Sequence, residues 1–441
     1  MVVIGYSIFI LKVTVICFFN FFNVDRYCMT WKYLKTCLWS TVVFFFVLGL
    51  FLTLERTNSW DILGVHHKSL MFADTIGLLA AIDCSNQGIN INEENPCDPW
   101  SRPLGYGSAV LYLGKVGLDI SDSYWLGWTV VVLFWIFALL ATRPSNFIQA
   151  GLILAVLVSP AVMFGAERAN IDLFIFCLVI VTIWLVLRSS MVAQTVAGIP
   201  VFLAAIIKIY PAAAAIGLVS IYWKYPQKRW IWITVLALFG LWIAFNISEV
   251  IAIKKSAARP AGAFTFGGEL LFFHINWGFT RATQLATMIL FMLVTIMALL
   301  LSVFFPLDIK GSTEFQKSAY MMGLSIMAFC FVATTNYDYR IIFFIFLFPF
   351  LFFMLENKKS VTWRWIALVT MLLLFFGLWR EAILPGGWGT PLNETRFYYI
   401  GEASLAWLMF VPLISIAFTI IGLDDVFREQ LKRSYRIPDV L

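Results

Sequence analysis

Charged side chains are scarce in this chain. Only 13% of its 441 residues are Asp, Glu, Lys or Arg, whereas 61% are hydrophobic and the mean hydropathy is +0.87. Soluble domains are roughly a quarter charged and about half apolar. The composition therefore excludes an ordinary soluble domain and predicts an integral membrane protein. The net charge of +6 does not indicate a nucleic-acid partner, because the basic residues gather on one side of the predicted membrane topology.

Cysteine is also too sparse and too dispersed for a disulfide scaffold. The chain has seven cysteines. Four lie in apolar runs: Cys17, Cys37, Cys177 and Cys330. Only Cys84 and Cys97 share a polar loop, where an oxidising compartment would allow a stabilising bridge. They can equally remain free thiols, and we favour the bridge.

Three further features are missing. His66 and His67 are adjacent in a polar loop, but no third ligand follows at helical spacing, so we expect no metal and no other bound cofactor. No Gly-rich phosphate-binding loop occurs in a polar segment, which argues against a nucleotide substrate. No internal repeat is found, although many secondary transporters have one.

Apolar runs of spanning length, roughly twenty residues, make up most of the chain. They cover residues 37–54, 123–141, 146–164, 171–187, 230–248, 282–305, 318–334, 340–355, 363–379 and 403–423. Residues 194–223 are too long for one span and too short for two, and Gly198, Pro200 and the stretch 208–211 interrupt them. We interpret this segment as a re-entrant or V-shaped helix pair. The predicted fold is an all-α polytopic membrane protein with about 11 transmembrane or re-entrant helices.

The distribution of Lys and Arg predicts the orientation, since cytoplasmic loops are enriched in them. It makes both termini cytoplasmic, in a plasma (inner) membrane. Residues 37–423 then form a single transmembrane domain, in which the loop 55–122 is extracytoplasmic. Residues 1–36 are a cytoplasmic or mis-started segment, beginning at Met1 or Met29, and residues 424–441 are a cytoplasmic tail.

The loop 55–122 is the longest polar segment and contains nine carboxylates. Asp74 lies in a short stretch with the pattern of an amphipathic helix along the membrane surface, which would hold its carboxylate firmly. It is our candidate general base, and Asp61 is the alternative. Each can also be an ordinary surface charge.

Short charged clusters recur in the other outer connections, at 167–172, 249–281, 336–340 and 380–402. Lys208 lies between two apolar arms, which predicts that its amine faces a polar cavity. A lipid-linked phosphate needs such cations, and an acceptor hydroxyl needs a carboxylate as general base. The candidate substrate-binding residues are Lys208, Tyr210, Arg340, Asp338, Arg168, Asn170, Asp172, Arg102 and His274.

These residues also have structural interpretations. Lys208, Arg168 and Arg340 can be snorkelling or paired charges at span ends. Asp172 and Asp338 can cap helices or pair with Arg168 and Arg340.

The long acidic first loop, followed by ERANID (167–172), KIYP (208–211) and NYDYR (336–340) at successive outer span ends, resembles the GT-C membrane glycosyltransferases. The likeness is to glycosyltransferase family 87, the polyprenyl-phosphate-mannose-dependent mannosyltransferases, over about residues 37–423. It implies a GT-C-like bundle whose first outer loop lies against the membrane. The family's catalytic aspartate would fall on Asp74, or on Asp61, and its Lys-x-Tyr-Pro element on Lys208, Tyr210 and Pro211.

Two positions depart from the family pattern. Ala169 stands where relatives often have Gly before the Asn, and residues 105–107 read Gly-Tyr-Gly where an Asn-Tyr-Pro might be expected.

The resemblance implies an inverting hexosyltransferase. It would move mannose, or a similar hexose or pentose, from a polyprenyl-phosphate-sugar to a hydroxyl of a glycan or glycolipid acceptor on the extracytoplasmic face. The expected partners are these substrates and membrane lipids, without nucleic acid. The alternatives are a polytopic transporter and a ligase or polymerase of lipid-linked glycans.

Overall fold

The computed structural model describes residues 31–65, 67, 70–256, 265–305, 307–333, 335–357, 360–383, 392–427 and 429. Residues 1–30 of the expected cytoplasmic start, including Met1 and Met29, lie outside the described residues, as do His66 and most of the expected C-terminal tail. Residues 31–36, also assigned to that start, are helical.

The described part of the chain is almost entirely helical. Eight of its helices are long and apolar enough to cross a membrane. They are α2 (Trp31–Thr57), α5 (Ser123–Thr142), α12 (Pro226–Phe245), α15 (Arg281–Phe304), α16 (Glu314–Ala333), the continuous pair η6 (Asp338–Leu347) and α17 (Phe348–Glu356), α18 (Val361–Ile383) and α19 (Leu392–Ile421). The strands β1 (Thr265–Phe266) and β2 (Asn336–Tyr337) pair antiparallel. The prediction of an all-α polytopic membrane protein is confirmed at this level.

The run predicted at 146–164 is a bent pair, α6 (Phe147–Leu157) and α7 (Pro160–Glu167), with 55° between them. Pro160 explains the break, since proline fits the first turn of a helix but cannot continue one. Because α7 turns, its C-terminal residues lie against α3 (Ala73–Asn86).

The segment 194–223 is broken where the sequence predicted. α9 (Met191–Val196) and α10 (Gly198–Ile207) lead to Lys208, which is extended at φ −141° and ψ 136°. The chain resumes in η4 (Tyr210–Ala212) and α11 (Ala213–Ile221).

The two arms of this segment return toward the same end of the bundle. The side chain of Gln194 donates to the carbonyl of Arg188, which follows α8 (Ile171–Val186), so the first arm runs back along α8. The second arm packs antiparallel to α16, because Tyr210 shares a cavity with Cys330 and Gly217 lies against Met321. The V-shaped arrangement, with Lys208 at its apex, is therefore present.

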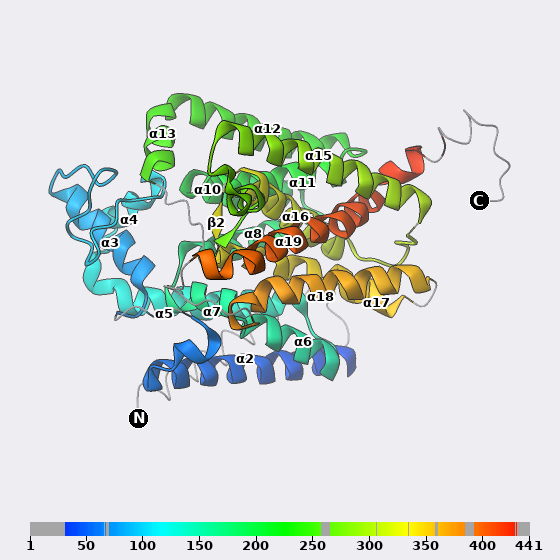
Figure 1. Ribbon diagram of the computed structural model, residues 1–441, viewed down its shortest axis with the longest axis horizontal. Helices are drawn as coiled ribbons and strands as arrows, with labels where there is room; N and C mark the ends of the chain where they lie inside the picture. The colour runs from blue at the N-terminus through cyan, green and yellow to red at the C-terminus, as the bar shows by residue number, and fades with distance from the viewer. Residues whose placement is uncertain are drawn as a thin grey trace.

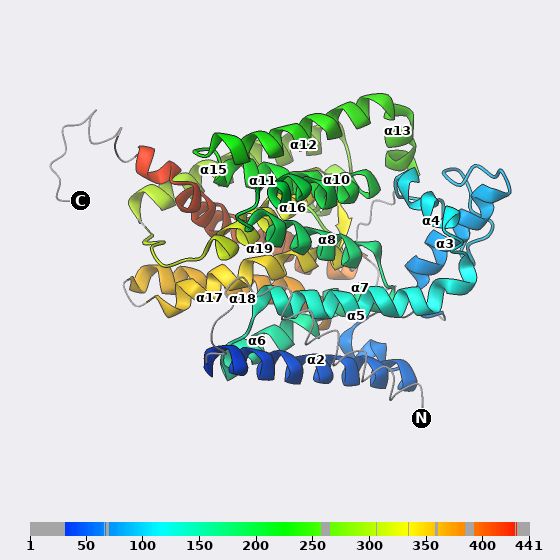
Figure 2. The ribbon, with the colours of Figure 1, turned by 180° about the vertical axis from the view of Figure 1, so that it is seen from behind.

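The long polar loop covers one end of the bundle. In Figure 1 the long helices run roughly side by side, and α3 and α4 (Tyr112–Lys115) lie beyond their left ends; Figure 2 shows the same arrangement from behind. A disulfide between Cys84 and Cys97 joins the end of α3 to the following loop, with 5.8 Å between the Cα atoms. The bridge favoured from the sequence is formed.

The sequence interpretation of α3 needs correction. The helix exists, but most of its residues are buried, including Leu79, Ala80, Ala81 and Ile82 in succession. Four consecutive residues point to all sides of a helix, so α3 is enclosed and not amphipathic. The remainder of the loop folds over it and buries residues such as Leu104 and Val110 against it.

Candidate functional site

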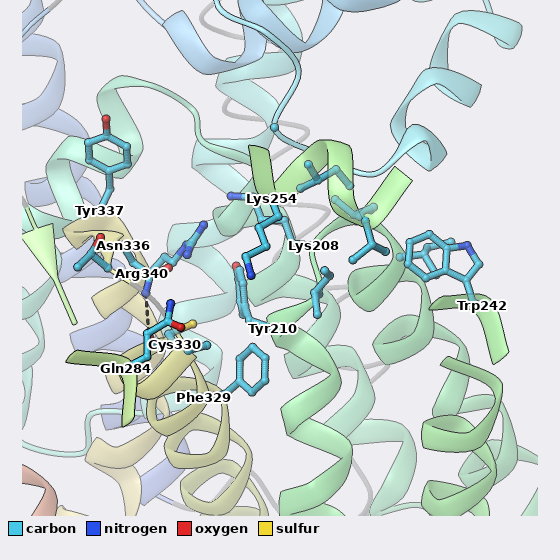
Figure 3. Close-up of a pocket in the computed structure, with 18 residues that line it drawn as sticks. Lys208, Tyr210, Trp242, Lys254, Gln284, Phe329, Cys330, Asn336, Tyr337 and Arg340 are labelled. Atoms are coloured by element: carbon cyan, nitrogen blue, oxygen red, sulfur yellow. Dashed lines mark hydrogen bonds between the residues drawn. The ribbon is translucent and has the colours of Figure 1, made fainter. Parts of the chain in front are cut away.

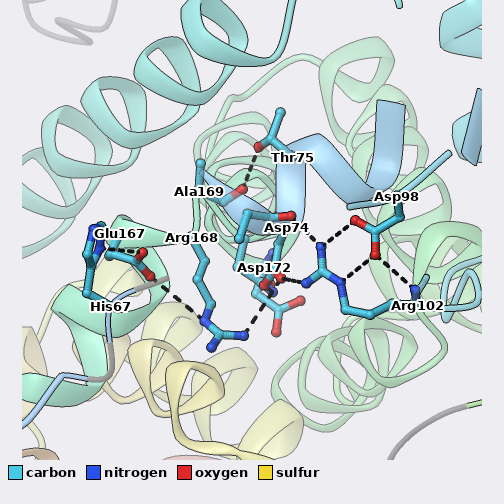
Figure 4. A network of polar contacts seen from close by, with 11 residues as sticks. His67, Asp74, Thr75, Asp98, Arg102, Glu167, Arg168, Ala169 and Asp172 are labelled. Atoms are coloured by element: carbon cyan, nitrogen blue, oxygen red, sulfur yellow. Dashed lines mark hydrogen bonds and ion pairs between the residues drawn. The ribbon is translucent and has the colours of Figure 1, made fainter. Parts of the chain in front are cut away.

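Asp74 is fixed at the first turn of α3 by the turn between α7 and α8. The Asp74 N–H donates to the carbonyl of Arg168 at 3.1 Å, and the Thr75 hydroxyl donates to the carbonyl of Ala169 at 2.9 Å. Figure 4 shows the side chains of α3 and this turn facing one another. The backbone of the 167–172 motif therefore positions Asp74, the candidate base in the long polar loop.

The Asp74 carboxylate lies among cations and an amide. Arg102 donates to Oδ1 at 2.9 Å, Asn170 donates to Oδ2 at 2.6 Å, and a guanidinium nitrogen of Arg168 lies 3.9 Å from Oδ1. Arg102 also binds Asp98 at 2.8 Å. Burial lowers the pKa of Arg102, but the hydrogen bond to Asp98 and the charge of Asp74 outweigh it and raise the pKa. The guanidinium stays charged and holds both carboxylates.

Asn170 joins this network to a second one. Its side-chain amide donates to Asp74, and its Oδ1 accepts from the N–H of Asp172 at 2.9 Å, which caps α8. The two contacts together fix the orientation of the buried amide. Asp74 and Asp172 are thus held by opposite ends of one side chain.

The second network places two cations on one carboxylate. The Lys208 ammonium contacts Asp172, and Nε of Arg340 lies 3.5 Å from the other oxygen of Asp172. Lys208 Nζ also lies 4.9 Å from the ring centroid of Tyr106 and 5.7 Å from that of Tyr339. These faces of aromatic rings favour a cation in a dry site.

The stretch 105–108 covers Lys208. The N–H of Gly107 donates to the carbonyl of Ile207 at 2.9 Å, and Glu249 accepts from the Ser108 hydroxyl at 3.0 Å. A Cβ at Gly107 would collide with the carbonyl of Ile206. The departure from the family at 105–107 thus allows a close backbone approach that a side chain would prevent.

A cavity of about 310 Å³ opens beside Lys208 and Arg340. Figure 3 shows both side chains within it, with Lys254 near Lys208. Apolar residues such as Ile206 and Trp242 form much of its wall. Asp74 is not among its lining residues; contacts through Asn170 and Asp172 connect it to Lys208. Lys208 lines a cavity, as expected, but the wall is largely apolar where a polar one was predicted, and the ammonium contacts Asp172, which is not a lining residue.

Pairing of Asp338 with Arg340, one of the structural alternatives, is not found among the described residues. Asp338 accepts from Arg380 of α18 at 2.5 Å, and Arg380 also contacts Glu402 and lies 3.2 Å from Glu381. Asp338 and Arg340 both belong to the 3₁₀ helix η6, in which residues two apart point in different directions, because each residue turns the chain by about 120°.

The alternative that pairs Asp172 with Arg168 is not found in the described part of the chain either, because the Arg168 guanidinium lies over the Phe164 ring, 4.3 Å from its centroid, and faces Asp74.

Two other candidates lie apart from these networks. Asp61 is exposed on η1 (Trp60–Leu63). His274 is buried on η5 (Phe273–Trp277) and stacks on Tyr399, with 5.1 Å between the ring centroids. Neither lines the cavity described above.

Several residues of the site were not among the candidates. The spacing of four residues between Asp98 and Arg102 could have indicated their ion pair. Arg380 stood out only as a cation at the end of an apolar run. Nothing in the sequence distinguished Gln284 and Thr335, which line the cavity.

No family model, curated protein or solved structure matches this chain. The likeness to family 87 therefore remains a resemblance of short motifs, and the site has to be interpreted from its own geometry.

The bridging role of Asn170 predicts a larger loss of stability than the loss of a cap alone. Asn170→Ala removes the cap of α8 and a hydrogen bond to a buried carboxylate, so we expect a loss of about 2–4 kcal/mol. The matched control is Asn146→Ala, because Asn146 caps α6 by accepting from the Gln149 N–H at 2.9 Å and has no carboxylate partner among the described residues. It should lose about 1 kcal/mol. Thermal unfolding in detergent measures both, and equal losses would contradict the bridge.

His67 predicts a dependence of stability on pH. The hydrogen bond with Glu167, at 3.0 Å, raises the pKa of His67 above 6.5, and the charges of Glu167, Glu55 and Asp61 add to this against a lowering by burial. The protonated form is therefore stabilising in full below pH 6.5, and this contribution is lost as the pH rises through the folded-state pKa.

We expect the difference in melting temperature between the wild type and His67→Gln to shrink above pH 6.5. Glu167→Gln should remove the same dependence. A difference that stays constant or grows with pH would show that His67 is not held in this way.

Proposed function

We propose that the protein is a membrane glycosyltransferase that moves a sugar from a polyprenyl-phosphate donor to an acceptor hydroxyl, with inversion at the anomeric carbon. The observation that carries this proposal is the cavity beside Lys208 and Arg340, whose wall is largely apolar apart from its cations and a few uncharged polar residues. A lipid-linked phosphate combines an anion with a long apolar chain. The motifs that resemble family 87 supply these cations and the carboxylate next to them.

Electrostatics supports an anion in this cavity. Lys208 and Arg340 share the single carboxylate of Asp172, so one positive charge remains. None of the described residues that line the cavity is acidic, and Lys254 adds a further cation. Away from water such charges act strongly on a phosphate.

The proposed reaction needs one base and one anion site. The Asp74 carboxylate takes the proton of the acceptor hydroxyl, whose oxygen attacks the anomeric carbon from the face opposite the phosphate. The bond from that carbon to the phosphate oxygen breaks, and polyprenyl phosphate leaves with the electron pair. Lys208 and Arg340 stabilise the charge that develops on it. Arg102 and Asn170 hold Asp74 in one orientation.

The donor and acceptor need separate approaches to such a site. Asp74 faces the covering loop through Arg102, whereas Lys208 faces the cavity. We assign the loop side to the acceptor and the cavity to the donor, with the reaction on the extracytoplasmic face.

A transporter is the second candidate, favoured by one observation. The broken segment has a buried Lys208 paired with Asp172 at its apex, as discontinuous helices have in transporter substrate pathways. Release of polyprenyl phosphate from a radiolabelled lipid-linked sugar, only when acceptor is present, separates an enzyme from a transporter.

Asp74→Asn tests the base. We expect the rate of sugar transfer to fall by about 10² to 10⁴, because the amide cannot take the proton, with binding of the lipid donor retained. Asp98→Asn is the matched control. It removes the other carboxylate that binds Arg102 and keeps the carboxylate at position 74. Radiometric transfer assays measure the rates. Full activity of Asp74→Asn together with inactive Asp61→Asn would move the role to Asp61.

Lys208→Met tests the phosphate site. The change removes the ammonium and keeps a long apolar side chain, so polyprenyl phosphate should bind about ten- to a hundred-fold more weakly. The single change leaves the Asp172 carboxylate buried with one cation fewer, which can destabilise the fold. The double variant Lys208→Met/Asp172→Asn removes that charge as well and therefore controls for misfolding. Lys115→Met, on the covering loop, should bind normally. Calorimetry in detergent gives the affinities, and unchanged binding by both Lys208 variants would refute the assignment.

A further inference from the structure

The cavity has chemically different sides. In Figure 3, Trp242 lies at one side, Lys208 and Tyr210 lie in the middle, and Gln284 and Asn336 lie at the opposite side. The wall thus changes from apolar through cationic to polar and uncharged. The proposed function uses only the first two parts.

The polar side contains a buried hydroxyl that has no partner. Thr335 is 2% exposed, and its hydroxyl makes no hydrogen bond within the described residues. Buried hydroxyls in folded proteins are nearly always paired, because an unpaired one is destabilising. Thr335 lines the cavity, so a bound molecule can supply the missing partner.

Gln284 adds an amide to the same wall. It lies in the first turn of α15, half-buried, and no hydrogen bond of its side chain is found among the described residues. The neighbouring Asn336 differs, since its amide donates to the carbonyl of Cys330 at 2.6 Å. Among the described residues, Gln284 and Thr335 are therefore two uncharged side chains of this wall whose polar groups remain available to a ligand.

The chemistry of this pair identifies its ligand. A hydroxyl and a carboxamide can each donate and accept, and neither carries charge. Such groups match the hydroxyls of a polyol, which also donate and accept. An anionic group would instead lie at Lys208 and Arg340.

We propose that Gln284 and Thr335 form a hydroxyl-binding subsite that holds the sugar of the lipid-linked donor. This subsite rests on the proposed function, because the sugar is placed next to the phosphate at Lys208 and Arg340. It assigns recognition of the sugar to the wall formed by α15 and the residue before β2, and recognition of the lipid phosphate to the apex of the broken segment.

The test compares two probes, polyprenyl phosphate and polyprenyl-phosphate-mannose, bound to the full chain in nanodiscs. The wild type should bind the mannosyl lipid more tightly. Thr335→Val and Gln284→Leu keep the approximate size of each side chain and remove its hydrogen bonds. Each should weaken binding of the mannosyl lipid by about three- to ten-fold and leave binding of the sugar-free lipid unchanged.

Matched controls are Thr195→Val and Gln227→Leu, which make the same changes on exposed positions of α9 and α12. They should bind both probes as the wild type does. Equal effects of the cavity variants on both probes, or no effect on either, would overturn the subsite and leave the proposed function standing. Failure of the wild type to bind either lipid would overturn both.

Discussion

Buried charge is the constraint on which this end of the molecule depends. Asp74, Asp172, Arg168 and Lys208 are all almost fully removed from solvent. An isolated buried ion costs several kcal/mol even after relaxation, and removing one member of a buried pair typically costs about 3–5 kcal/mol. Each of these groups must therefore have its partner in place for the helices to meet as they do. The same ion pairs therefore stabilise the packing of these helices and form the candidate site.

The turn between α7 and α8 uses its backbone carbonyls to hold Asp74 beside its charged partners. Ala169 has φ +44°, in the left-handed region that non-glycine residues rarely adopt. This conformation costs roughly 1–2 kcal/mol. It directs the Arg168 and Ala169 carbonyls toward α3, where Asp74 and Thr75 donate to them. Strain at one residue is thus offset by contacts that position the carboxylate.

The sequence predicted the features that depend on local pattern. Hydropathy located the apolar spans, and Lys208 marked a break because an amine between apolar arms needs a polar surrounding. Pairing between distant elements was not predictable in this way. Asp338 lies two residues from Arg340 yet binds Arg380 in another helix, and α3 is enclosed by a loop whose path no periodicity reveals. The bridge between Cys84 and Cys97 was predictable because these two cysteines share one polar loop.

The position of Asp172 leaves the cations of the cavity partly neutralised and still accessible to a ligand. The carboxylate lies behind Lys208, at the start of α8, and is absent from the residues that line the cavity. It neutralises part of the positive charge and so lowers the cost of burying two cations. Because it neutralises only one of them, a net positive charge remains beside the cavity, and this charge favours binding of an anion. An apolar wall on one side and an uncharged polar wall on the other match the order of lipid chain, phosphate and sugar in the proposed donor.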